Sequence, residues 1–409
     1  MTRVSNPGRR RLVAGGVGAA AASVMPLGGL AFAQSGTVEL PFANGARKLV
    51  AFPEKRPMIV LTSRPPQLET PFSVFNDGVI TPNDAFFVRY HNAGIPTSID
   101  AATHVIKVGG NAAGKPLSLT LADLKSQFKP VEIVAVNQCS GNSRGFFDPR
   151  VTGGQSANGA MGNARWTGVP LKDILARAEI RNSAKQVTFD GLDTALFGGG
   201  DFVKALDVAQ AMDPDVLVAW QMNGADIPML NGYPVKLIVP GHYGTYWVKH
   251  LSQIDVIDNV FEGFWMKPGY RVPDNDCVCV APGTAPAATR PIDRFTVRSF
   301  VTSLVDGQRI ARGTNTVVRG IAFDGGKGIR EVGVSIDGGQ TWRQAQLGAD
   351  LGRYSFREFT FGFVADKPGV VDVRSCAWSN SGVGQPTTAV WQPSGYMRNV
   401  IESTKVVVA

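Results

Sequence analysis

The fold and the chemistry of this chain are indicated most clearly by the segment VEIVAVNQCSGNSR, residues 131–144. Its first six residues are mostly apolar and β-branched, which predicts a buried strand. Cys139 follows in a glycine-containing turn, where a side chain is presented rather than packed. Arg144 lies close enough along the chain to activate the thiol or to bind the same anion. A buried packing cysteine and a catalytic nucleophile are the alternatives, but the local sequence supplies no partner to orient a nucleophile.

Short strands and helices are expected around this segment. Thr120 and Asp123 have the spacing of a capping box at the start of a short helix. Pro170 opens a second helix, whose apolar residues recur on one face. Residues 235–239 have the composition of another buried strand. We therefore expect residues 81–280 to form a mixed α/β domain.

The sequence changes character toward its C-terminal part. Residues 281–293, APGTAPAATRPID, have the composition of a linker. Apolar residues then alternate at 332–336 and lead into a glycine turn at 337–339, one of several such strand patterns. This predicts an immunoglobulin-like, all-β sandwich over 294–409, so that the fold class is α+β. Residues 34–80 are rich in proline without a sustained period, and we expect an extended arm there.

The first 33 residues have the pattern of a signal peptide. Arg9–Arg11 precede an apolar, small-residue run from Leu12 to Leu30, and Ala31-Phe-Ala33 resembles a cleavage site. The arginines suggest the twin-arginine route to the periplasm, whereas a membrane anchor would need a longer run. Removing residues 1–33 takes away four arginines and no acid, which lowers the formal charge from +8 to +4. We expect a mature protein with no membrane span and, lacking basic runs interleaved with aromatics, no nucleic-acid partner.

Two further segments carry residues suited to a site. Arg89 and His91 lie two residues apart in FFVRYH, so on an extended chain both point the same way and suit an oxyanion or a phosphate. A surface strand with a solvated histidine is the alternative. Residues 159–170 form a glycine-rich stretch, expected to be a loop before the second helix whose amides could cradle a phosphate. That signal is weak, because glycine-rich loops are common.

Four cysteines limit the redox chemistry of the chain. Their positions, 139, 277, 279 and 376, do not match iron–sulfur spacings, and no C-x-x-C-H haem attachment motif occurs. We expect no haem in this chain. An exported protein is free to form disulfides.

Taken together, these segments resemble the sulfite oxidase family of molybdenum enzymes. The resemblance covers nearly the whole chain after residue 33, and its motifs follow one order. They are FFVRYH (86–91), the cysteine turn (137–144), NARWTGVPL (163–171), VKLIVPG (235–241) and WVKHL (247–251). VSIDGGQTW (334–342) resembles the family's dimerisation domain, and FWMKPGYRVPDN (264–275) is similar to exported bacterial sulfite dehydrogenases that lack a fused haem domain.

The resemblance implies a molybdenum–molybdopterin cofactor with one pterin per metal. Cys139 would be the thiolate ligand of the metal, and Arg89, Arg144 and Tyr270 would bind the substrate or act in catalysis. Residues implied to bind the cofactor are Phe87, Val88, Arg89, Tyr90, His91, Cys139, Asp193, Asn231, Lys236, Trp247, Val248 and Lys249.

Several positions depart from the family pattern. Ser156 and Ser394 stand where relatives have a pocket tryptophan and a third pocket arginine, although Arg398 lies close enough to substitute. These departures bear on substrate preference more than on cofactor binding. Cys277 and Cys279 match no metal ligand of the family, and we expect loop residues or a disulfide to Cys376.

The function implied is oxidation of sulfite to sulfate. Electrons would pass to an external c-type cytochrome, and the protein would be a dimer, either of two copies or with the cytochrome. A same-fold oxidoreductase acting on sulfoxides or other oxoanions is one alternative. A non-catalytic β-sandwich binding protein is another, and molybdenum analysis would separate it from an enzyme.

Export supplies the first prediction. A pterin cofactor is inserted in the cytoplasm, so the protein must cross the membrane folded, which requires the twin-arginine route. Changing Arg9–Arg11 to lysine keeps the charge and removes the recognised pair. We expect active enzyme to accumulate in the cytoplasm, as measured by sulfite assay of cell fractions. Wild-type levels of active periplasmic enzyme would contradict the prediction.

Overall fold

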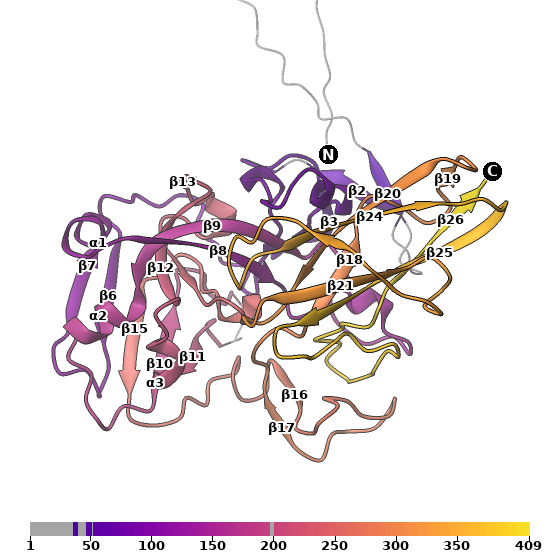
Figure 1. Ribbon diagram of the computed structural model, residues 1–409. Helices are drawn as coiled ribbons and strands as arrows, with labels where there is room; N and C mark the ends of the chain where they lie inside the picture. Colours follow the sequence, from indigo (N-terminus) through magenta and orange to yellow (C-terminus); the bar gives the residue numbers. More distant parts are fainter. Residues whose placement is uncertain (1–35, 40–45, 51, 197–199) are drawn as a thin grey trace, which may run out of the picture. The chain divides into compact units, whose positions relative to one another are not determined.

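The strand that precedes Cys139, β8 (Val131–Gln138), is the edge strand of one sheet in a mostly β structure (Figure 1). The structure is a computed structural model that describes residues 36–39, 46–50, 52–196 and 200–409, so the predicted signal segment 1–33 lies outside the described residues. Ala135 and Val136 in β8 are fully buried, as expected. The strand ends directly before Cys139.

The neighbour of β8 corrects one expectation from the sequence. Residues 161–170 form the long strand β9 (Met161–Pro170), not a loop, and pair antiparallel with β8 and with β12 (Leu217–Met222). The glycines in β9 serve close packing. A Cβ at Gly168 would lie 2.3 Å from the carbonyl oxygen of Val218 in β12. Glycine is needed here for the approach of two backbones, not for a phosphate.

The strands of two five-stranded sheets alternate along this part of the chain, one sheet around β8 and β9 and the other mainly antiparallel. The first has the order β13-β12-β9-β8, with β14 paired to β12, and the second has the order β11-β10-β15-β6-β7. The remaining strands of these sheets are β13 (Ala225–Asp226), β14 (Lys236–Ile238), β6 (Val105–Gly109), β7 (Leu117–Thr120), β10 (Gln186–Asp190), β11 (Lys204–Asp207) and β15 (Gln253–Ile257).

The described residues include three short α-helices. They are α1 (Leu121–Gln127), α2 (Leu171–Arg177) and α3 (Val208–Ala211). The capping box predicted for α1 is confirmed: the backbone N–H of Asp123 donates to Thr120 Oγ1 at 3.1 Å, and that of Thr120 donates to Asp123 Oδ2 at 2.9 Å. The helix predicted after Pro170 is confirmed as α2, whose apolar face is fully buried.

The described part of 34–80 takes part in a five-stranded antiparallel sheet. Its strands are β1 (Thr37–Glu39), β2 (Ala46–Val50), β3 (Met58–Ser63) and β4 (Pro66–Glu69), followed by β5 (Val88–Arg89). Met58 and Ile59 are consecutive and both buried, which is why the sequence shows no alternation in β3. This sheet places Arg89 at the end of its last strand.

Two sheets in the C-terminal part share one hydrophobic core. One has the order β18-β20-β24-β23 and the other β19-β26-β25-β21-β22. Their bounds are β18 (Arg298–Val301), β19 (Arg309–Ile310), β20 (Asn315–Phe323), β21 (Ile329–Ser335), β22 (Arg343–Gln344), β23 (Gln346–Leu347), β24 (Arg357–Val364), β25 (Gly369–Ser379) and β26 (Ser403–Val408).

Shorter elements connect these sheets. β16 (Arg271–Pro273) pairs with β17 (Thr289–Pro291), so the predicted linker 281–293 ends in a strand. The 3-10 helices are η1 (Phe72–Asn76), η2 (Asn83–Ala85), η3 (Arg144–Phe146), η4 (Met229–Asn231) and η5 (Gly244–Tyr246).

The disulfide differs from the one expected. Cys277 is bonded to Cys279, and Cys376 is a free cysteine buried in β25. The pairing with Cys376 was therefore wrong, because that side chain faces the interior of the C-terminal sheets.

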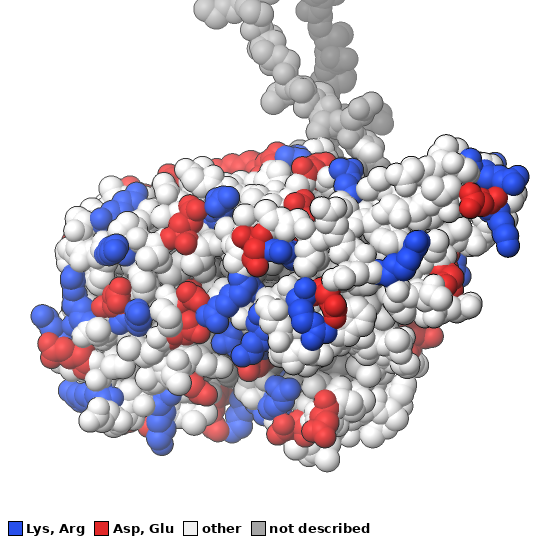
Figure 2. Space-filling view, in the orientation of Figure 1, with Lys and Arg blue, Asp and Glu red and all other residues white. Residues whose placement is uncertain are grey.

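The surface offers little that identifies a partner. On the face shown in Figure 2, basic and acidic side chains are interspersed. Within the described residues, no helix combines the length and the apolar character needed to cross a membrane. The charge that bears on function lies inside the protein.

Candidate active site

Two pockets meet at the turn that follows β8. The first, called here the lysine pocket, is lined by Lys236 and Lys249, and the second, the arginine pocket, by Arg89 and Arg144. Cys139 and Arg89 line both. Predicted residues that line the lysine pocket are Phe87, Arg89, Tyr90, His91, Cys139, Asp193, Asn231, Lys236, Trp247, Lys249 and Tyr270.

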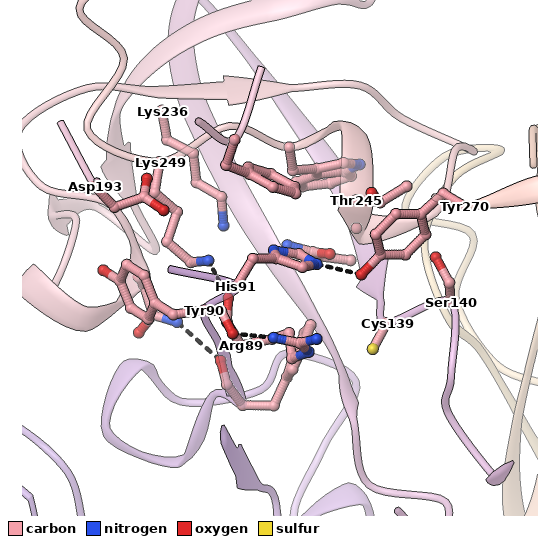
Figure 3. A pocket seen from close by; sticks show the side chains of 16 residues that line it. Arg89, Tyr90, His91, Cys139, Ser140, Asp193, Lys236, Thr245, Lys249 and Tyr270 are labelled. Carbon is pink, nitrogen blue, oxygen red and sulfur yellow. Dashed lines mark hydrogen bonds between the residues drawn. The ribbon is translucent and has the colours of Figure 1, made fainter. Parts of the chain in front are cut away.

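Cys139 has a free, half-buried thiol. Its backbone N–H donates to the carbonyl of Ala160 at 2.9 Å, and its own carbonyl accepts from the N–H of Asn142 at 3.0 Å. These bonds tie the turn to the start of β9. Figure 3 shows Lys236, Lys249 and Asp193 toward one end of the lysine pocket and Cys139 with Tyr270 toward the other.

The lysine pocket contains buried lysine side chains whose charged form burial disfavours. The Lys236 side chain is only 1% exposed, and its ammonium lies 4.9 Å and 5.6 Å from the ring centres of Trp166 and Trp247. Burial lowers the pKa of Lys236 well below its ordinary value, and the nearby Lys249 and Lys55 lower it further. Burial also lowers the pKa of Lys249 to about 8. Three lysines therefore share one poorly solvated region.

A single aspartate on the wall opposes this charge. Asp193 is buried, which raises its pKa, while Lys249 acts in the opposite direction. Lys55 is bonded within the protein, since its ammonium donates to Asn231 Oδ1 at 2.5 Å and to the carbonyl of Phe86 at 3.0 Å. Buried charges are costly unless they are paired. The pocket is thus built for an anionic occupant.

Unpartnered polar atoms on the wall support the same conclusion. Among the described residues, Asn137 Oδ1, Ser140 Oγ and Thr245 Oγ1 are buried, line the lysine pocket and have no hydrogen-bond partner within the protein. Buried polar groups are nearly always hydrogen-bonded. Their position indicates a ligand with several donors and acceptors.

The arginine pocket brings two guanidinium groups to the same side of Cys139. Arg89 donates from Nη1 to the carbonyl of Tyr90. The guanidinium of Arg144 lies against Gly141 and Gly153, where an added Cβ would come within 2.7 Å of it. Glycine at both positions makes room for the side chain. Two planar, permanently charged forks beside one thiol suit a small oxyanion.

His91 contributes a neutral ring, not a second cation. Its Nε2 is hydrogen-bonded to the hydroxyl of Tyr270, and its ring stacks on Phe202 with centroids 3.9 Å apart. Burial, with Arg89 and Lys249 adding to it, lowers the pKa of His91 well below the ordinary value. Burial raises the pKa of Tyr270. At neutral pH the pair therefore consists of an uncharged imidazole and an uncharged phenol.

The remaining predicted residues have other positions. Val88 lines the arginine pocket, as does Ser156, whose hydroxyl donates to the carbonyl of Gly141 at 2.6 Å. Val248 is buried in the core and lines neither pocket. Arg398 does not supply the missing pocket arginine, because its guanidinium bonds Glu402.

Sequence reasoning missed several wall residues. Thr245 and Phe202 line the lysine pocket but lie in segments without a distinctive pattern. Lys55, which bonds the wall residue Asn231, belongs to the proline-rich arm, where no motif marks it. Tertiary contacts alone bring these side chains to the pocket.

Comparison with known proteins gives the family. Residues 92–265 match the oxidoreductase molybdopterin binding domain, and residues 289–408 match the Mo-co oxidoreductase dimerisation domain. Mitochondrial sulfite oxidase of Rattus norvegicus is 34% identical over 306 residues, which cover 72% of this chain and 54% of that protein. The chain belongs to the sulfite oxidase family of molybdenum oxidoreductases.

Other members of the sulfite oxidase family are also similar to this chain. Sulfite oxidase of Arabidopsis thaliana is 28% identical over 334 residues, 78% of this chain and 83% of that protein. Among solved structures, the sulfane dehydrogenase SoxCD from Paracoccus pantotrophus matches with a TM-score of 0.73 and 25% identity, covering 84% of each chain. The matched region spans about half the length of the rat protein.

The family's molybdenum–pterin cofactor fits the residues of the lysine pocket. Lys236 and Lys249 could hold its anionic groups, and the unpartnered atoms of Asn137, Ser140 and Thr245 could bond its polar edges. A free thiol at the meeting point of the two pockets is a suitable ligand for a soft, redox-active metal. The site therefore has the charge and the donors that this cofactor requires.

Removing one buried lysine tests this fit. In Lys236→Met the pocket keeps its volume and loses one positive charge, so cofactor affinity should fall by about 10- to 100-fold, as for the loss of a charged hydrogen bond. Molybdenum and pterin content per purified chain measure the effect. Lys125→Met is the matched control, since Lys125 also lies over an indole ring, that of Trp220, but is exposed. Equal cofactor content in the Lys236→Met variant and the wild type would contradict the assignment.

Proposed function

We propose that this protein oxidises sulfite to sulfate at a molybdenum–pterin centre. One observation carries the proposal: the Cys139 thiol lies where a pocket rich in buried lysine meets a pocket bounded by two arginines. The first is suited to an anionic cofactor and the second to a small anionic substrate. Sulfite matches the second pocket in charge, and the sulfite oxidases among the relatives favour this substrate class.

The chemistry divides between the cofactor and the chain. Sulfite and water give sulfate, two protons and two electrons, and the bound molybdenum centre supplies the two-electron redox step. Arg89 and Arg144 hold the oxyanion, so its sulfur is oriented toward the Cys139 end of the site. Their fixed charges also stabilise negative charge on the oxygens throughout the reaction.

The hydrogen-bonded pair of His91 and Tyr270 is suited to present a donor to an oxyanion. The neutral imidazole of His91 can donate its Nε2–H to the hydroxyl oxygen of Tyr270, which leaves the phenol proton free for another acceptor. The raised pKa of Tyr270 keeps its hydroxyl protonated, so it remains a hydrogen-bond donor toward an oxyanion. We assign the pair to orienting the substrate by this hydrogen bond.

We propose that electrons leave one at a time to a c-type cytochrome outside this chain. The sequence holds no C-x-x-C-H haem attachment motif, which favours an acceptor on another chain. We further propose that the protein acts in the periplasm after twin-arginine export, which the pattern of residues 1–33 favours.

The C-terminal part is proposed to be an immunoglobulin-like dimerisation domain over residues 294–409, next to a catalytic domain over 81–280. Two sheets sharing one core support the sandwich assignment, and the match to a dimerisation domain supports assembly into a dimer.

A second candidate is oxidation of another sulfur compound. The structural likeness to sulfane dehydrogenase SoxCD favours it. Assays with sulfite, thiosulfate and a dialkyl sulfoxide on the same preparation would separate these activities.

Loss of the thiol is the central test. Cys139→Ser should leave a folded protein without sulfite oxidation, because a hydroxyl is a poor ligand for a soft metal. Activity with ferricytochrome c, circular dichroism and molybdenum content are the measurements. Cys376→Ser, which removes the other free thiol, should keep full activity. Near-normal turnover in Cys139→Ser would mean that this residue is not the ligand.

The arginine pair makes a separate prediction. Arg89→Met or Arg144→Met should raise KM for sulfite by about 10- to 100-fold, with a smaller fall in kcat, because each removes a charged hydrogen bond to the substrate. Lysine should restore only part of the affinity, since it lacks the planar fork. Arg330→Met is the control, because Arg330 pairs with Glu331 at the surface. An unchanged KM would remove the tested arginine from the substrate site.

A further inference from the structure

Arg144 in the wall of the arginine pocket contacts a segment from the other end of the chain, residues 394–397. The carbonyl of Ser394 accepts a hydrogen bond from Arg144 Nε at 3.2 Å. The backbone N–H of Met397 donates to the carbonyl of Ser140, 3.4 Å away, next to the cysteine. The hydroxyl of Ser394 donates to the carbonyl of Arg271, one residue after Tyr270, at 3.1 Å. The segment thus contacts the cysteine turn, Arg144 and the Tyr270 strand together.

Tyr396 lies at the centre of these contacts. The guanidinium carbon of Arg144 lies 5.0 Å from the centre of the Tyr396 ring. The Tyr396 ring also stacks on Tyr270, with centroids 5.4 Å apart and planes at 4°. One phenol ring therefore touches both the substrate arginine and the tyrosine that bonds His91.

The packing around Arg144 leaves it few alternative positions. Gly395 has φ +60°, and a Cβ there would lie 2.9 Å from Arg144 Cγ and 2.4 Å from Val151 Cγ2. Gly141 and Gly153 enclose the guanidinium on other sides. With the Tyr396 ring in place, the arginine is enclosed by backbone and one aromatic face.

We propose that Tyr396 is a positioning residue that fixes Arg144 for anion binding. The inference rests on the proposed anion site. It assigns to the C-terminal segment a share in substrate affinity that is exerted through Arg144. A flat ring under a guanidinium stabilises the cation and limits its rotation.

Three variants test the role of the ring. Tyr396→Leu removes both ring contacts and should raise KM for sulfite by roughly three- to thirty-fold, the range of one cation–π contact, with a smaller effect on kcat. Tyr396→Phe keeps the ring but loses the hydroxyl, which interacts with Arg144, so its rise in KM should be smaller than that of Tyr396→Leu. In an Arg144→Met background, Tyr396→Leu should raise KM no further, because the residue acts through that arginine.

A binding measurement keeps this inference separate from the proposed reaction. Calorimetric titration of the holoenzyme with sulfate should show the same order of affinities, with the Kd raised in Tyr396→Leu by the factor seen in KM. If the wild type binds sulfate but does not oxidise sulfite, the proposed reaction fails. The Kd values of the Tyr396 variants for sulfate then still decide the role of Tyr396. No sulfate binding by wild type would overturn the inference.

Two controls separate positioning from general stability. Phe361→Leu removes a similar contact in the C-terminal sheets, where Arg343 lies 4.6 Å from the centre of the Phe361 ring. This variant should leave KM for sulfite and Kd for sulfate unchanged. Should Tyr396→Leu fail to fold, Gly395→Ala presses on Arg144 from the same segment and should raise KM and Kd likewise. An unchanged KM in a folded Tyr396→Leu variant, or a further rise on the Arg144→Met background, would overturn the assignment.

Discussion

Buried positive charge without matching negative charge is the constraint on which this structure depends. Lys236 and Lys249 line one pocket with Asp193 as the carboxylate on its wall, and Arg89 and Arg144 bound the next. Such an arrangement is costly unless anions occupy it. The sheets supply the rigidity that holds like charges together, and the site gains affinity for a cofactor and a substrate that carry the opposite charge.

The edge strand β8 places the Cys139 thiol beside these lysine and arginine side chains. Its pairing with β9 fixes where the strand ends, and the turn that follows puts Cys139 between the two pockets. Glycine in β9 allows the close approach of β12, so a segment that resembled a flexible phosphate loop is a rigid part of the sheet. A thiol held in this way is preorganised, which favours a defined ligand geometry over a mobile nucleophile.

Long-range contacts complete the site from three separate parts of the chain. The arm contributes Lys55, which holds Asn231, and the C-terminal segment contributes Tyr396, which packs against Arg144. One large hydrophobic core includes Trp166 and Trp247 together with Phe356 from the C-terminal part. The candidate site therefore depends on the packing of regions that the sequence suggests are separate domains.

The sequence by itself determined the local features of this protein. The apolar run before Cys139, the capping box at Thr120 and the motif order that resembles the sulfite oxidase family depend on neighbours in the chain, so they are visible without a structure. Tertiary structure alone decided the neutral state of His91, the unpartnered atoms of the pocket wall and the pairing of Cys277 with Cys279. The physical reason is that burial and charge balance depend on which distant segments pack together, and no local pattern records that.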